Sequence, residues 1–341
     1  KRKYLRLAYK KYKLGKMEGM KKFKFRQPWV QYYATFETFK SLNNLRPWNE
    51  WKEEQKFYFD SHTTPPRNLM DKVDYYVFEQ YIAFKQWKKV LSYANLKKVK
   101  IIADMPFYVG YDSLEVWLHK DQFLMDEKYN PTLVSGCPPD AFSDDGQLWG
   151  TPIFDFKKME ENGYKFLVHR IGYLASTCDY LRLDHFRAWD TYCVIPAEDD
   201  NARRGEWLIG PRTKFFDRLF DVYPDINLIA EDLGELFQGV HDLRDYYEFP
   251  GMFITQFTIF DDWCISKDTQ IVYPGTHDND TLQGWINSLP NYRIEQLEKK
   301  VDKHNNVIER LVLLEHDVKN LGNLKNSLIS ENKEKNVCAV I

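Results

Sequence analysis

The sequence predicts an α/β fold, a (β/α)8 barrel of the TIM type that carries loop insertions. Short apolar runs typical of strands alternate with amphipathic helical patterns along the chain, and this order implies a parallel sheet covered by helices. Three of the apolar runs end in a carboxylate, and these acids, Asp184, Glu231 and Asp278, are equally spaced. Parallel barrels carry their catalytic groups at the carboxyl ends of strands, so the three acids are expected to share one site.

Helical and strand-like segments follow one another in a regular order. Apolar residues recur at steps of three, four and seven over 71–94, which predicts a long amphipathic helix. Shorter helical patterns over 166–174 and 216–220 each precede a strand that ends in an acid. The five strands expected for the barrel are 99–104, the strand that ends at Asp184, the strand that ends at Glu231, 252–258 and 270–276.

A long insertion, residues 108–155, separates the first two expected strands and is rich in Gly, Pro, Asp and aromatic residues. Irregular insertions of this length on a rigid scaffold are usually functional loops. A surface excursion with buried aromatic side chains is the alternative.

The end of the chain differs in character from the rest. From Ile294 to Leu328 the apolar residues follow three- and four-residue spacings with one change of phase, which is typical of a coiled coil. The sequence thus divides into a barrel domain, 1–290, and a helical tail, 291–341, through which a homo-oligomer is expected. A single amphipathic helix that folds back on the barrel is the alternative.

Composition narrows the class of protein. The net charge of −2 argues against a general binder of polyanions or of membrane surfaces. Residues 1–26 are strongly basic, which we interpret as a solvated helix surface, with an arm that touches nucleic acid as the alternative. Five cysteines without paired spacing favour a reducing compartment. With no long apolar stretch and no signal-peptide pattern, a cytoplasmic protein without a membrane partner is expected.

The strand that ends in Asp184 predicts the surroundings of that acid. A side-chain period of two turns Arg182 and Asp184 to one side and Leu181 and Leu183 to the other. The arginine is then expected to favour the ionised form of Asp184 and to lower its pKa. Two carboxylates with a third acid and an adjacent Arg and His suit glycosidic bond chemistry, in which one acid is an ionised nucleophile and the other a proton donor. Glu231 would have to be kept protonated by its surroundings.

The sequence gives no reason to expect a cofactor or a metal. It contains no Gly-rich phosphate loop, no Cys/His spacing typical of metal sites and no nicotinamide fingerprint. Any activity is therefore expected to need no added cofactor and to survive chelation.

Several ordered segments resemble the signature regions of the 4-α-glucanotransferases (amylomaltases or disproportionating enzymes, glycoside hydrolase family 77), relatives of the α-amylases. The resemblance runs from Trp29 to Trp285 and includes ADMPFYV, PPDAF, GQLWG, LRLDHFRAW, GEWLIGP, LIAEDLG, FPGM and GTHDND. It implies that Asp184 is the nucleophile, Glu231 the acid/base and Asp278 the stabiliser of the transition state. The substrate-binding residues implied beside these acids are Arg182, His185, His277 and Asp104, with Asp140, Phe142, Trp149 and Trp207 from the segments PPDAF, GQLWG and GEWLIGP.

The resemblance implies transfer of α-1,4-glucan segments between maltooligosaccharides by a retaining double displacement. Departures from the family pattern keep two alternatives open. Family members usually carry a long segment before the equivalent of Lys1 and a final strand after Trp285, so the barrel looks truncated at both ends. The connection 260–271 is shorter, and Ala141 stands where many members have Tyr. The alternatives are an α-glucan hydrolase and a catalytically incompetent fragment that acts as an oligomerising module.

Overall fold

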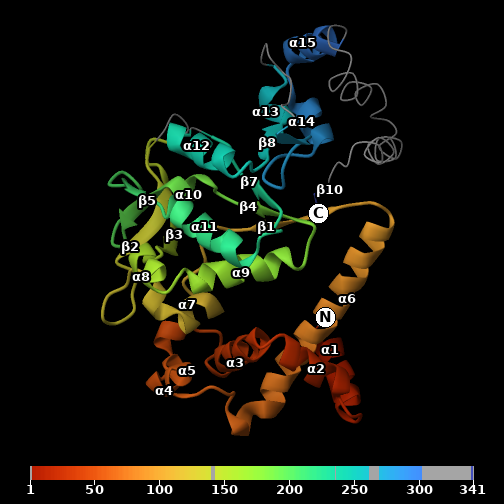
Figure 1. Ribbon diagram of the computed structural model, residues 1–341, viewed down its shortest axis with the longest axis vertical. Helices are drawn as coiled ribbons and strands as arrows, with labels where there is room; N and C mark the ends of the chain where they lie inside the picture. Colours follow the sequence, from red (N-terminus) through yellow and green to blue (C-terminus); the bar gives the residue numbers. More distant parts are fainter. Residues whose placement is uncertain (1, 140–142, 235, 261–268, 302–338, 341) are drawn as a thin grey trace. The chain divides into compact units, whose positions relative to one another are not determined.

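The chain folds into two compact units, each built from separate stretches of sequence, in a computed structural model (Figure 1). The first unit contains 1–93, 108–170 and 191–222, and the second contains 94–107, 171–190 and 223–341. The division predicted between residues 290 and 291 stays a prediction. The residues that the structure describes are 2–139, 143–234, 236–260, 269–301 and 339–340.

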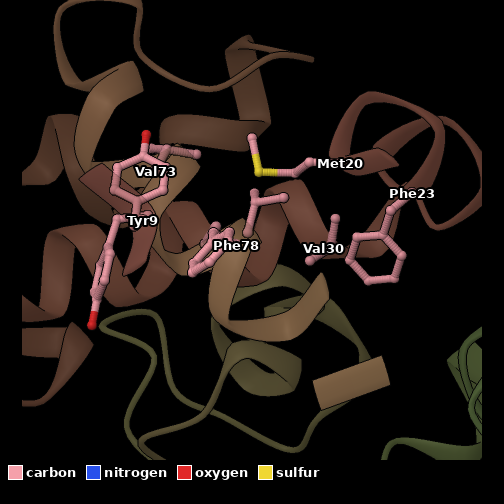
Figure 2. Close-up of a cluster of buried hydrophobic side chains, with 9 residues drawn as sticks. Tyr9, Met20, Phe23, Val30, Val73 and Phe78 are labelled. Carbon is pink, nitrogen blue, oxygen red and sulfur yellow. The ribbon is translucent and has the colours of Figure 1, made fainter. Parts of the chain in front are cut away.

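Helices form the amino-terminal part of the first unit. Their apolar faces meet in a cluster that includes Tyr9, Met20, Val30 and Phe78 (Figure 2). The basic side chains of the first two helices are exposed, except that Lys24 is half-buried and pairs with Asp74. These side chains are therefore solvated, as expected, and the choice between a solvated helix surface and an arm that touches nucleic acid stays a prediction. The helices are α1 (Arg2–Lys13), α2 (Glu18–Arg26), α3 (Trp29–Leu42), η1 (Trp48–Glu50), α4 (Glu53–Lys56), α5 (Tyr58–Ser61), η2 (Arg67–Leu69) and α6 (Met70–Leu96).

The first unit also contains an antiparallel sheet. Its order is β3-β2-β5-β6, and two of its strands come from the insertion 108–155. The insertion was expected to be irregular, but part of it is regular, because it pairs with β5 through main-chain hydrogen bonds. The strands are β2 (Leu133–Cys137), β3 (Gln147–Pro152), β5 (Thr191–Pro196) and β6 (Glu206–Ile209), and the nearby helices are α7 (Leu114–Leu118), η3 (Lys120–Gln122), α8 (Phe156–Glu161) and α11 (Arg212–Val222).

The second unit contains the parallel strands (Figure 1), and five of them lie in the order of the sequence. Three pair in one sheet, in which Leu181 lies between Ala103 and Leu228. The other two pair with each other, and the Ala230 N–H reaches the Pro250 carbonyl across the junction. The strands are β1 (Ile101–Met105), β4 (Tyr180–Leu183) and β7 (Leu228–Ala230), then β8 (Gly251–Ile254) and β9 (Gln270–Tyr273), with β10 (Ala339–Val340) beside β1.

All five predicted strands and the three predicted helices are present, but two strands end several residues earlier than expected. The fifth strand, expected over 270–276, ends at Tyr273. The fourth strand was expected over 252–258, but it ends at Ile254 and the chain turns into a short helix. Local hydrogen bonds explain this, since the Thr258 hydroxyl donates to the Ile254 carbonyl and the Ile259 N–H to Thr255. The remaining helices are α9 (Lys165–Ala175), α10 (Arg187–Asp190), α12 (Gln238–Tyr246), α13 (Thr255–Thr258), α14 (Leu282–Ser288) and α15 (Asn291–Val301).

A small core joins the two groups of parallel strands. Ile102, Ile229, Met252, Ile254 and Tyr273 are buried together, and they come from strands on both sides of the junction. Because these side chains pack together, the two groups of parallel strands lie in one layer, and their carboxyl ends lie at the same edge of that layer.

Of the predicted helical tail, 291–341, the structure describes 291–301, where α15 covers the beginning of the heptad pattern, and 339–340, which form the strand β10 and not a helix. Residues 302–338 and 341 lie outside the described residues, so the coiled coil over 291–341 stays a prediction. Among the helices that the structure describes, none is long and apolar enough to cross a membrane.

Candidate active site

The catalytic candidates follow neighbouring parallel strands of the second unit. Asp184 comes directly after β4, Glu231 directly after β7, and Asp278 lies in the loop after β9. Asp104 is the penultimate residue of β1. Asp184 and Glu231 therefore lie at the carboxyl ends of their strands as predicted, whereas Asp278 lies in the loop beyond the end of β9 at Tyr273.

Arg182 links the ends of three strands. Its Nη1 donates to Asp104 Oδ1 at 2.6 Å and to Asp184 Oδ1 at 3.0 Å, and its Nε donates to the Met252 sulfur at 3.3 Å. Leu181 and Leu183 on the same strand are fully buried. The alternation predicted for this strand is confirmed. The arginine is 7% exposed, whereas the side chains of its partners Asp104 and Asp184 are 38% and 39% exposed, so water reaches the carboxylate side of both ion pairs.

Main-chain hydrogen bonds hold the two central acids beyond the ends of their strands. The Asp184 N–H donates to the Met105 carbonyl, and the Glu231 N–H donates to the Leu183 carbonyl, both at 3.1 Å. The Phe186 N–H donates to the Glu231 carbonyl at 3.3 Å. Each acid is thus positioned by the neighbouring strand rather than by a free loop.

Glu231 is adapted to hold a proton. Burial raises its pKa to about 7, and the negative charge of Asp184 acts in the same direction. Arg182 and the N–H groups of His185 and Leu233 oppose this rise. Burial therefore favours the protonated form of Glu231, which is the direction that a proton donor requires.

The net shift in the pKa of Asp184 is opposite to the effect expected from Arg182 alone. This pKa is raised, because burial outweighs the attraction of Arg182, and the charges of Asp104 and Asp278 add to the rise. The predicted effect of Arg182 is confirmed in direction, since its charge and its hydrogen bond both lower the pKa of Asp184, but the burial of this acid, which the sequence did not show, outweighs that effect. Arg182 limits the rise, so two neighbouring carboxyl groups can take different protonation states.

His185 has two unusual properties. Its backbone is left-handed, with φ 49°, and this turn follows Asp184 immediately. Burial lowers the pKa of the imidazole to about 4, with a further contribution from the positive charge of Arg187. The ring is therefore neutral at physiological pH and can both donate and accept a hydrogen bond.

Asp278 and His277 are more exposed than the central acids. Their side chains are 75% and 62% accessible, and His277 Nε2 lies 3.4 Å from Asp278 Oδ2. The side chain of Asn279 shapes the loop, since its Oδ1 accepts from both the N–H and the hydroxyl of Thr276 at 2.9 Å. The structure brings Asp278 near enough to raise the pKa of Asp184, whereas its contact with sugar stays a prediction.

The predicted aromatic platforms belong to the first unit. Trp149 in β3 is 40% exposed, and its Nε1 donates to Gln147 at 3.1 Å. Trp207 in β6 is half-buried and packs against a cluster that contains Val134 and Ile195. Asp140 and Phe142 lie outside the described residues. The sugar-binding role of these four residues stays a prediction.

Sequence reasoning missed Met252, whose sulfur contacts Arg182. The segment FPGM was noted only as part of the resemblance, and nothing in its letters indicates a contact with an arginine two strands away. Within the described ranges no group of three His, Cys, Asp or Glu side chains is arranged to hold a metal ion.

The chain is similar to proteins of known family. The model of the family described as 4-alpha-glucanotransferase, glycoside hydrolase family 77, matches residues 1–336. The chloroplastic/amyloplastic 4-alpha-glucanotransferase of Solanum tuberosum is 39% identical over 77% of this chain and 47% of its own length. The 4-alpha-glucanotransferase of Clostridium butyricum is 38% identical over 84% of this chain and 61% of its own. The chain thus spans about half the length of the curated relatives it matches.

A solved structure agrees with the sequence relatives. The amylomaltase of Streptococcus agalactiae, solved in complex with acarbose, superposes with a TM-score of 0.81 at 31% identity over 92% of this chain and 66% of that one. The likeness supports an α/β fold of the TIM-barrel type for this chain. With a family model that matches almost its whole length, the chain belongs to the 4-alpha-glucanotransferase family, glycoside hydrolase family 77.

Proposed function

We propose that this protein transfers α-1,4-glucan segments between maltooligosaccharides with retention of the α-linkage. The observation that carries the proposal is the pairing of two unlike carboxyl groups at neighbouring strand ends. Glu231 keeps its proton up to about pH 7, while Asp184 is held by Arg182 at 3.0 Å. A retaining mechanism needs such a proton donor beside a nucleophile.

In the first step Asp184 attacks the anomeric carbon of a bound glucan. The bond from this carbon to the glycosidic oxygen breaks, and Glu231 donates its proton to the departing oxygen. The product is a glucosyl ester of Asp184. In the second step the ionised Glu231 takes the proton of an acceptor 4-hydroxyl, whose oxygen displaces Asp184 and restores the α-linkage.

We infer α-1,4-glucans and maltooligosaccharides as the substrates. The names of the family and of the relatives support this choice, as does the acarbose bound to the Streptococcus agalactiae amylomaltase. Asp278 and His277 are accessible enough to meet sugar hydroxyls. The negative charge of Asp278 acts on Asp184, whose pKa it helps to raise, and this supports a role for Asp278 in holding the sugar while positive charge develops on it.

As part of the same proposal we place the protein in the cytoplasm. The support is its cysteine content, five residues without paired spacing. The thiol of Cys178 is free, and burial raises its pKa, which makes it less prone to oxidation. Fractionation of the source cells with an antibody would test this placement.

The test is incubation of the full chain with maltotriose, followed by separation of products by length. Transfer predicts glucose together with oligosaccharides longer than maltotriose. Maltose and glucose alone would indicate hydrolysis, and no product from folded protein would contradict both activities. Asp184→Asn and Glu231→Gln should each lower turnover by orders of magnitude. Glu161→Gln, at an exposed position of α8, is the matched control and should retain wild-type turnover.

A further inference from the structure

The residue after Glu231 carries a buried carboxylate that the proposed mechanism does not use. The side chain of Asp232 is only 4% exposed. Its Oδ2 accepts a hydrogen bond from Arg244 Nη1 at 2.6 Å, and its Oδ1 accepts from the Met252 N–H at 2.7 Å. A buried carboxylate is costly unless it is fully paired, so this arrangement is a specific one.

Asp232 lies where the two groups of parallel strands meet. The main chain joins β7 to β8 through the hydrogen bond from Ala230 to Pro250. One step further along, the Asp232 carboxylate takes the place of a carbonyl and accepts the Met252 N–H. A side chain therefore continues the pairing at the position where the acid/base residue leaves the strand.

Gly251 makes this close approach possible. A methyl group on its α-carbon would overlap both carboxylate oxygens of Asp232. Because glycine has no Cβ, the carboxylate can lie directly against the backbone of β8.

The same carboxylate is connected to both catalytic acids. On one side, Asp232 stands between Glu231 and Leu233, whose N–H donates to the Glu231 carboxylate. On the other side, Met252 is fixed through its N–H by Asp232, and its sulfur accepts a hydrogen bond from Arg182. Arg182 in turn holds Asp184.

We propose that Asp232, paired with Arg244 and seated against Gly251, is a positioning residue that fixes Glu231 and the Arg182–Asp184 pair in one geometry. This inference rests on the proposed transfer reaction. A shift of about 1 Å in a catalytic group can cost about 100-fold in rate. Loss of the Asp232 contacts should therefore act on turnover more than on substrate binding.

Four variants of the full chain separate the effect of the position of the Asp232 carboxylate from the effect of its charge. Asp232→Ala removes both contacts, whereas Asp232→Asn keeps an oxygen for the Met252 N–H. Gly251→Ala keeps both charges and displaces the carboxylate. Asp245→Asn is the matched control, because Asp245 pairs with the same arginine at 2.8 Å but is 65% exposed.

Transfer from maltotriose is the first readout. We expect Asp232→Ala and Gly251→Ala to lower kcat by about 10- to 100-fold with KM changed by less than about threefold. Asp232→Asn should fall between these variants and the wild type, and Asp245→Asn should match the wild type. Wild-type kcat in folded Asp232→Ala would overturn the proposal.

Titration of the Glu231 carboxyl carbon by NMR is the second readout, and it does not depend on turnover. In Gly251→Ala a displaced Glu231 gains water, so its pKa should fall from about 7 toward the ordinary value of 4.5. A loss of activity that follows only the loss of folded protein, with this pKa unchanged, would show a structural role and overturn the proposal. If the wild type fails to transfer glucan, the proposed function fails, and this titration still tests the positioning.

Discussion

At the scale of single residues, Arg182 influences the protonation of the whole site. It contacts the carboxylates of Asp104 and Asp184. Its positive charge opposes the rise in pKa of both Asp184 and Glu231. The nucleophile must be ionised and the proton donor protonated, so turnover is expected to follow a bell-shaped pH profile. Burial raises both pKa values, which places both limbs above those of ordinary carboxyl groups.

Replacement of Arg182 by Gln tests this influence. Because the positive charge lowers both pKa values, its loss should move both limbs of the kcat profile to higher pH and lower kcat at the optimum. The profile is measured with maltotriose. Arg204→Gln in the first unit, where the arginine is 62% exposed and pairs with Asp199, should leave the profile in place. Limbs of the profile that move apart, or that move to lower pH, would contradict the assignment of Arg182 as the charge that lowers both pKa values.

Glu231 also predicts a pH dependence of stability that does not require activity. Its protonated form stabilises the fold fully below its ordinary pKa of 4.5, and this contribution is lost as the pH rises through about 7. Glu231→Gln stays neutral, so relative to the wild type it should gain up to about 3 kcal/mol between pH 4 and pH 8. Urea unfolding of both proteins across this range measures the gain. If the difference between the two free energies of unfolding does not change with pH, Glu231 ionises normally in the folded chain.

The residues of the site could be predicted from sequence more readily than their energetics. The period of two along 181–184 is enough to place Arg182 beside Asp184. The sign of the shift in the pKa of Asp184 depends on how deeply three strands bury it, and burial is not visible in a short motif. Asp232 was missed for a similar reason, because its partners, Arg244 and Met252, are distant in the sequence.

At the scale of elements, strongly apolar runs and helical periodicity identified the parallel strands and their helices. The early end of β8 could not be read from the run 252–258, because Thr and Ile favour strands until local hydrogen bonds form a turn. The antiparallel strands β2, β3, β5 and β6 were missed, since their segments contain or adjoin Gly and Pro residues that are typical of loops. Their order also brings together segments from both sides of β4.

The helical cluster of the first unit predicts a large effect from one truncation. The ring of Phe78 is 3% exposed and lies 5.5 Å from the ring of Tyr9 and 5.2 Å from that of Tyr12. Phe78→Ala should cost about 3–5 kcal/mol in the free energy of unfolding, through lost burial and a cavity. Urea unfolding followed by circular dichroism measures this cost. Tyr4→Ala, at a residue 75% exposed, is the control and should stay within about 0.5 kcal/mol of wild type.

At the scale of the whole molecule, the chain passes between its two units several times. A sequence displays neighbours along the chain, so it predicts strands and motifs but not which distant stretches pack into one unit. The catalytic candidates nevertheless all fall in the second unit, because they follow its parallel strands. The first unit carries the basic helices and the antiparallel sheet.

The heptad pattern of the tail predicts self-association. Apolar residues at coiled-coil spacing should join chains through 291–341. Sedimentation of the full chain and of a chain that ends at residue 290 measures this, with the full chain heavier than a monomer and the shortened chain monomeric. An unchanged monomer in both would remove the coiled-coil proposal without touching the assignment of the acids.

The central claim is that Asp184 and Glu231 act as nucleophile and acid/base, and trapping the covalent intermediate tests it most directly. Glu231→Gln is incubated with α-maltotriosyl fluoride, whose leaving group needs no proton, so the first step can proceed while the second lacks its base. Mass spectrometry of the digested protein should find a maltotriosyl group on the peptide that contains Asp184, and no adduct in the variant that also carries Asp184→Asn. An adduct on another carboxylate, or none from folded protein, would contradict the account.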